Sequence, residues 1–170
     1  MRLIISPASE VTRVCRKVRP SHLLRLVSPG QSEHRVDLTT DAVLTLVMHD
    51  IAHPSPGRVA PDRAMIQALL EFSGGWSGAR PLVTQCWAGV SRSPASAFII
   101  ACQKRPDASE RELAAALRRA VPQATPNPLM VAHADALLGR AGRMIAAVHE
   151  IGRGADFTGL VCTEFHLATA

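Results

Sequence analysis

Five residues separate Cys86 from Arg92 in the stretch TQCWAGVSRSPAS, residues 84–96, and none of the five is acidic. The apolar residues before this stretch and the helix-like pattern after it predict a strand, a loop and a helix in succession. Loop amides and a helix N-terminus bind anions such as phosphate, and Gly89 permits a backbone turn that a side chain would forbid. An arginine can donate hydrogen bonds to two phosphate oxygens at once. It also lowers the pKa of a nearby cysteine, which favours the thiolate. The stretch therefore predicts a phosphate-binding loop that carries a nucleophile.

A second candidate group, Asp50, lies just after the apolar run at residues 43–48. If the strands predicted at 43–48 and 81–85 are parallel, Asp50 and Cys86 leave the same edge of the sheet. A carboxyl group at that place can act as a general acid and base. The alternative for Asp50 is a turn or capping carboxylate.

The loop resembles the signature of the cysteine-dependent protein tyrosine phosphatases, H-C-x5-R-[S/T], in the compact dual-specificity-like form found also in small bacterial members. The resemblance implies that Cys86 attacks phosphorus to form a cysteinyl-phosphate, while Arg92 and the loop amides stabilise the phosphoryl oxygens. It implies that Asp50 protonates the leaving oxygen and then activates water, and that Ser93 donates a hydrogen bond to the departing thiolate. It implies no metal and no cofactor. The signature often contains A-G-x-S-R-S-P, and the residues that match the two patterns are Cys86, Ala88, Gly89, Ser91, Arg92, Ser93 and Pro94.

The same resemblance gives the other loop residues a substrate-binding role. These residues are Trp87, Ala88, Gly89, Val90 and Ser91. Because the loop holds no lysine, phosphotyrosine or another simple monoester is expected ahead of a highly anionic inositide. Trp87 either shapes the rim of the site or packs beneath the loop.

The segment Thr125–Pro–Asn–Pro128 is similar to the Pro-Asn segment that precedes a helix in this family and packs near the phosphate loop. Asn127 is therefore expected to support the site by hydrogen bonds to loop residues. A role as the N-cap of the following helix is equally consistent with its position.

Gln85 stands where the family usually has a histidine, and glutamine carries no charge. A thiol with the ordinary pKa of about 8.5 is still roughly 3% thiolate at pH 7. Glutamine in place of the histidine therefore lowers the thiolate fraction of Cys86 by at most about thirty-fold. This predicts a slower or tuned enzyme rather than an inactive one. Two alternatives remain: a phosphate-binding pseudophosphatase that recruits phosphorylated partners, and a rhodanese-type sulfurtransferase.

The elements that must position these residues follow from hydrophobic periodicity. Apolar runs predict strands at 3–5, 22–28, 43–48 and 81–85, and helical patterns cover about 8–18, the region after Pro61, 92–104, the region after Ser109, 128–138 and 142–151. Strands that alternate with helices predict an α/β fold with a central, mainly parallel sheet of about four or five strands, flanked by helices. Its C-terminal half is helical, and the whole is similar to the protein tyrosine phosphatases.

Length and composition limit the remaining possibilities. The 170 residues predict one domain, 1–170, with a core at about 3–151 and a weakly patterned tail at 152–170. The net charge is +5, but the basic residues are scattered without aromatic neighbours, so no nucleic-acid partner is expected. No apolar run predicts a secretory signal or membrane span, and the four cysteines lack metal-ligand spacing. We expect a cytoplasmic protein whose partner is a phosphorylated protein or small phosphomonoester; the sequence predicts no oligomeric state.

Overall fold

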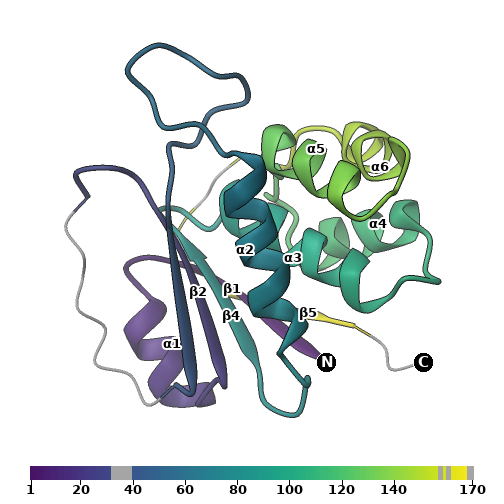
Figure 1. Ribbon diagram of the computed structural model, residues 1–170. Coiled ribbons are helices and arrows are strands. Elements are labelled where there is room, and N and C mark those ends of the chain that lie inside the picture. The colour runs from purple at the N-terminus through teal and green to yellow at the C-terminus, as the bar shows by residue number, and fades with distance from the viewer. Residues whose placement is uncertain (32–39, 157–158, 160–161, 168–170) are drawn as a thin grey trace.

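In the computed structural model the chain builds one five-stranded sheet with helices on both faces (Figure 1). The structure describes residues 1–31, 40–156, 159 and 162–167. The strand order is β3-β2-β4-β1-β5, and β5 alone of these runs antiparallel to its neighbour. The four strands predicted from the sequence and the mainly parallel sheet are confirmed. The strands are β1 (Arg2–Pro7), β2 (His22–Val27), β3 (Ala42–Val47), β4 (Leu82–Cys86) and β5 (Thr163–His166).

The described helices are divided unequally between the two faces of the sheet. Helix α1 covers one face, and the other five helices lie on the opposite face (Figure 1). Their bounds are α1 (Val11–Val18), α2 (Arg63–Gly74), α3 (Arg92–Lys104), α4 (Glu110–Ala120), α5 (Pro128–Leu137) and α6 (Arg143–Ile151). Among the described residues, no helix has both the length and the apolar character that a bilayer crossing requires.

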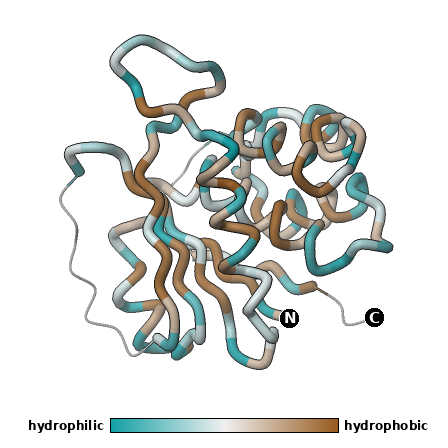
Figure 2. The backbone as a smooth tube through the Cα atoms, in the orientation of Figure 1, coloured by the Kyte–Doolittle hydropathy of each residue, from teal (hydrophilic) through white to brown (hydrophobic). Residues whose placement is uncertain are grey.

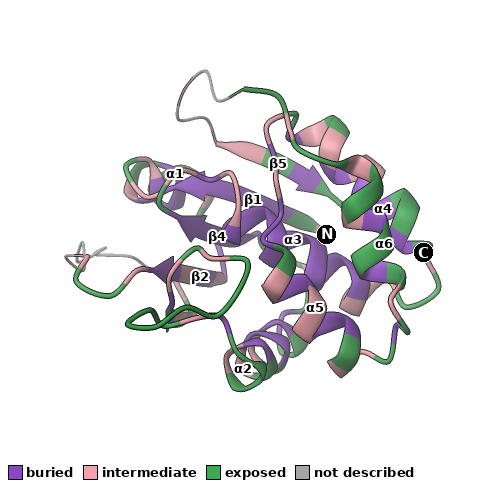
Figure 3. Cartoon of the chain, turned by 90° about the horizontal axis from the view of Figure 1, so that it is seen from above, coloured by how far each residue is buried: buried purple, intermediate pink, exposed green. Residues whose placement is uncertain are grey.

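The alternation of side chains along the strands divides the core into two parts. In β1, Leu3 and Ile5 belong to the large core beneath α2–α6, whereas Ile4 packs with Val14 and Cys15 of α1. Figure 2 shows the apolar colouring along the strands and on the inner sides of the helices. Helix α3 is buried from Arg92 to Cys102, and Figure 3 shows it between the sheet and the other helices of the same face. The first residues of α3 are therefore held rigidly.

The parallel arrangement brings four strand ends to one edge of the sheet. β1, β2, β3 and β4 all end there, because each is paired in parallel with its neighbour. The residues just after β2 and β3, and the last residue of β4, are thus neighbours in space although they are far apart in the chain. Parallel α/β sheets bind ligands at this edge.

The strand β5 lies in the segment for which the sequence predicted no element. It extends the sheet beyond β1, with Phe165 opposite Leu3. Phe165 is almost fully buried and joins the large core.

Candidate active site

The loop between β4 and α3 begins at Cys86 and reaches the helix at Arg92. Gly89 has φ = 76°, and a Cβ there would lie 3.3 Å from the backbone nitrogen of Pro7. Both its conformation and its contact with the end of β1 therefore require glycine.

Neighbouring segments brace the loop through its carbonyl groups. The carbonyl of Trp87 accepts from the N–H of Ala8 at 3.1 Å, and that of Val90 accepts from the N–H of Thr125 at 2.8 Å. A trans peptide points its N–H opposite to its C=O, so the following N–H groups point away from these braces. This orientation is the one that an anion-binding loop requires.

The thiol of Cys86 lies at the base of the loop and is 2% exposed. Its Sγ is 3.0 Å from Oγ of Ser93, in the first turn of α3. The hydroxyl of Thr84 donates to the carbonyl of Ser93 at 3.2 Å and ties this turn to β4. The structure therefore places the predicted nucleophile and the predicted hydrogen-bond donor in direct contact.

The remaining three thiols belong to a different environment. Burial raises the pKa of Cys102 to about 12 and that of Cys15 to about 11. Burial likewise raises the pKa of Cys162, although the hydroxyl of Ser6 partly opposes the shift. A raised pKa gives these three cysteines a smaller thiolate fraction near neutral pH than an ordinary thiol has, so they are poor candidates for a nucleophile.

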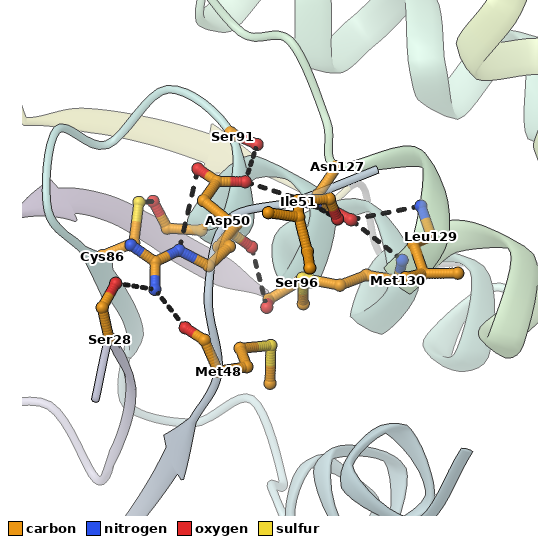
Figure 4. A network of polar contacts seen from close by, with 12 residues as sticks. Ser28, Met48, Asp50, Ile51, Cys86, Ser91, Ser96, Asn127, Leu129 and Met130 are labelled. Carbon is orange, nitrogen blue, oxygen red and sulfur yellow. Dashed lines mark hydrogen bonds and ion pairs between the residues drawn. The ribbon is translucent and has the colours of Figure 1, made fainter. Parts of the chain in front are cut away.

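The guanidinium of Arg92 is buried beside the loop, at 3% exposure. It donates to the carbonyl of Met48 at 2.8 Å and to Oγ of Ser28 at 3.1 Å (Figure 4). Its Nε has no hydrogen-bond partner among the described residues, and the nearest carboxylate oxygen, Oδ2 of Asp50, is 3.7 Å away. Part of its donor capacity thus remains for a ligand.

The carboxylate of Asp50 is positioned from two sides. Its Oδ1 accepts from Oγ of Ser91 at 2.8 Å and from Nδ2 of Asn127 at 2.9 Å (Figure 4). Asp50 is therefore held beside the loop between β4 and α3, at the edge of the sheet where the parallel-strand argument places it. His49, its neighbour, closes the base of a different loop, residues 49–59, by accepting from the N–H of Val59 through Nδ1.

Asn127 fills the N-cap role that the sequence left open, and its side chain bonds to the segment that carries Asp50 rather than to the loop after β4. Its Nδ2 donates to Asp50 and to the carbonyl of Ile51, at 2.9 and 3.1 Å. Its Oδ1 accepts from the N–H groups of Leu129 and Met130 and caps α5. The side chain therefore connects the start of α5 to the segment that carries Asp50.

A cavity of about 370 Å³ lies over these groups. Its described lining includes every predicted substrate-binding residue except Gly89. Ser28 and Gln31 also line it, and the sequence analysis did not single them out. Ser28 could have been found from its position just after β2, because that strand ends at the same edge of the sheet as β3 and β4. The described lining residues are Ser28, Gln31, Asp50, Cys86, Trp87, Ala88, Val90, Ser91 and Arg92.

Gln85 and Trp87, on either side of Cys86, have opposite environments. Gln85 is 3% exposed and lies in register with Ser6 of β1 and Arg25 of β2, away from the cavity lining. Its Oε1 is buried without a hydrogen-bond partner among the described residues. Trp87 is 62% exposed, so of the two placements open at the sequence level, the rim is the one observed.

Comparison with known proteins identifies the fold. No protein-family profile and no curated protein matches the chain. Among solved structures, human DUSP28 is 15% identical, with a TM-score of 0.60 over 82% of this chain and 92% of that one. DUSP15 is 15% identical, with a TM-score of 0.58 over 88% and 89% of the two chains.

A third similar structure is the human tyrosine phosphatase-like serine/threonine/tyrosine-interacting protein. It is 18% identical, with a TM-score of 0.59 over 82% of this chain and 92% of that one. The chain therefore has the fold of the dual-specificity type of protein tyrosine phosphatase. At these identities the likeness concerns the fold, and function must be argued from the site.

Proposed function

We propose that the protein is a phosphomonoester hydrolase of the protein tyrosine or dual-specificity type, acting through a cysteinyl-phosphate intermediate. The observation that carries the proposal is the convergence of Cys86, Arg92 and Asp50 on one cavity at the carboxyl edge of the sheet. Cys86 and Arg92 lie at the two ends of one loop, and Asp50 joins them from the segment after β3. A nucleophile, a cation and a carboxyl group are what phosphoryl transfer to a side chain requires.

In the first step, the thiolate of Cys86 attacks phosphorus and the ester P–O bond breaks. Asp50, protonated for this step, gives its proton to the departing oxygen. Arg92 and the loop N–H groups compensate the charge of the phosphoryl oxygens. Because Arg92 Nε lies only 3.7 Å from Asp50, a bound phosphate competes with that carboxylate for the guanidinium.

In the second step, water attacks the phosphorus of the cysteinyl-phosphate and the S–P bond breaks. Asp50, now a carboxylate, accepts a proton from the water. The hydroxyl of Ser93, 3.0 Å from Sγ, donates to the thiolate as it leaves. Inorganic phosphate and the free thiolate are the products.

A phosphate-binding pseudophosphatase is the alternative, and the uncharged Gln85 is the observation that favours it. Such a protein needs the loop and Arg92 for binding. It has no use for a hydrogen bond from Ser93 to Cys86 or for a positioned carboxyl group at Asp50. These two features favour turnover.

The test is vanadate-sensitive hydrolysis of an aryl phosphate by the wild type, Cys86→Ser, Asp50→Ala and, as a thiol control, Cys162→Ser. We expect Cys86→Ser to abolish turnover and Asp50→Ala to lower kcat by about 10²- to 10³-fold. Cys162→Ser should retain activity, because Cys162 lies outside the cavity. A wild type that binds phosphate without hydrolysing an ester would establish the pseudophosphatase alternative instead.

A further inference from the structure

Trp87 is the most exposed of the large apolar side chains in the described part of the chain, at 62%. Leaving an indole in water forgoes the stabilisation that burial of such a side chain provides. The position is nevertheless well defined, because the Trp87 carbonyl is hydrogen-bonded to Ala8 and the residue directly follows Cys86. The fold therefore fixes the backbone position from which the indole extends, at the rim of the cavity beside the nucleophile.

The composition of the cavity indicates which ligand the indole fits. Arg92 is the one cation among the described lining residues, and Asp50 is the one anion. Ala88 and Val90 add apolar surface next to Trp87. A ligand with several phosphates would need further cations, whereas one phosphate on an apolar group matches this lining.

We propose that Trp87 is a specificity-determining residue that contacts the aromatic ring of an aryl phosphomonoester bound at Cys86. The inference rests on the proposed function and narrows it. Aromatic rings associate in offset-stacked or edge-to-face pairs, a preference that an alkyl phosphate cannot use. Phosphotyrosine is the protein side chain with this chemistry, so the enzyme prefers it to phosphoserine and phosphothreonine.

The kinetic test compares Trp87→Ala and Trp87→Phe with the wild type on phosphotyrosine and phosphoserine. We expect Trp87→Ala to lower kcat/KM for phosphotyrosine about tenfold and to change that for phosphoserine less than about twofold. Trp87→Phe, which keeps an aromatic face, should retain most of the preference. Ile145→Ala is the matched control, because Ile145 is 47% exposed on α6 and does not line the cavity.

A binding test without turnover separates this inference from the proposed function. The chain has two tryptophans and no tyrosine, and the second tryptophan, Trp76, is 1% exposed. In a Cys86→Ser background, phosphotyrosine should change the emission of Trp87 and bind more tightly than phosphoserine or inositol phosphate. Trp87→Phe in this background leaves Trp76 as the emitter, so it should remove the fluorescence response.

The outcomes are distinguishable. Equal losses for the aryl and alkyl esters in Trp87→Ala, or tighter binding of inositol phosphate than of phosphotyrosine, would overturn the role of Trp87. Those results would leave the proposed hydrolysis intact. Trp87-dependent binding of phosphotyrosine to a wild type that lacks turnover would instead overturn the hydrolysis and support the aryl specificity. If no phosphate ester binds, both proposals are wrong.

Discussion

At the C-terminal end of α3, the guanidinium of Arg140 donates to the carbonyls of Cys102 and Pro106 and to the carboxylate of Glu110, at 2.7–3.1 Å. At the N-terminal end of the same helix, Arg92 is buried even more completely. It has one backbone carbonyl and one hydroxyl as close acceptors, and its nearest carboxylate oxygen is 3.7 Å away. Two buried guanidinium groups at opposite ends of one helix are thus compensated very differently.

The helix dipole makes the difference more pronounced. A cation near a helix C-terminus, such as Arg140, is stabilised by the partial negative charge of the terminal carbonyls. A cation at the N-terminus, such as Arg92, lies where the dipole already favours an anion. An incompletely paired guanidinium at that end, facing a cavity, indicates an anion-binding site. Arg140, whose acceptors lie at 2.7–3.1 Å, instead stabilises the fold.

The largest predicted effect follows from this contrast. Arg92→Ala should lower kcat/KM for an aryl phosphate by about 10³-fold, because the phosphoryl oxygens lose their main side-chain donor. The free energy of unfolding should fall less than in Arg140→Met, because removing Arg92 costs two hydrogen bonds but also relieves the desolvation of an incompletely paired buried charge. Steady-state kinetics and urea denaturation of the same preparation measure both quantities.

Arg140→Met should show the reverse pattern. Removing one partner of a buried ion pair destabilises a protein by about 3 kcal/mol, and the carbonyls at the end of α3 also lose their donor. Arg143 remains beside Glu110 and limits the loss. Turnover below the denaturation midpoint should be unchanged. If Arg140→Met impaired turnover while Arg92→Ala lowered stability more than Arg140→Met did, our division of the two arginines would be wrong.

Asn127 tests whether the site depends on a residue that also stabilises a helix. Asn127→Ala should lower kcat about 10- to 100-fold through displacement of Asp50, and stability by about 1 kcal/mol through loss of the α5 cap. Asn127→Asp keeps an oxygen for the cap but cannot donate to Asp50. It should lose activity, and repulsion between the two neighbouring carboxylates should lower stability even though the cap is kept. Full activity in Asn127→Asp would show that Asn127 caps α5 but does not position Asp50 for catalysis.

The sequence predicted those parts of the site that local pattern and strand direction determine. The loop was evident because its residues are contiguous, and Asp50 was found because parallel strands end at one edge. The contacts of Arg92 with Ser28 and Met48 were not predictable, because they join residues 64 and 44 positions apart. A single sequence does not show which of many hydroxyls or carbonyls an arginine reaches.

The fold shows the same division between local and long-range information. The four parallel strands are apolar runs that can be recognised without their partners. The strand β5 has four residues, of which only Phe165 is buried, so its alternation is too short to indicate a strand. It is stabilised by pairing with β1 from the other end of the chain. Long-range pairing is the part of the fold that pattern analysis misses.

Gln85 is uncharged, and it offers a position at which a substitution can add charge beside the site. Its buried Oε1 has no partner among the described residues, so this side chain, like Arg92, is incompletely satisfied. Gln85→His should increase the thiolate fraction of Cys86, by at most about thirty-fold at pH 7. The rate of alkylation of Cys86 as a function of pH measures the effect, in a Cys162→Ser background that removes the half-buried second thiol. An unchanged profile would show that position 85 does not tune the nucleophile.

The smallest predicted effect concerns acid stability at the compensated end of α3. Burial opposes ionisation of Glu110, but its own backbone N–H, Arg143 and Arg140 outweigh burial and lower the pKa of its carboxyl group. A lowered pKa stabilises the fold above the unfolded-state value of about 4.3, and this contribution is lost as the pH falls through the folded-state value. Glu110→Gln should therefore reduce the slope of unfolding free energy against pH below about pH 4.3.

The matched control is Glu150→Gln, because Glu150 forms an ion pair with Arg111 at a half-exposed position. Exposed ion pairs contribute little to stability, so this variant should keep the acid dependence of the wild type. Neither substitution touches the cavity, and activity at neutral pH should be the same in both. If Glu110→Gln and the wild type had identical acid profiles, the stabilising charge at this end of α3 would have to come from groups other than Glu110.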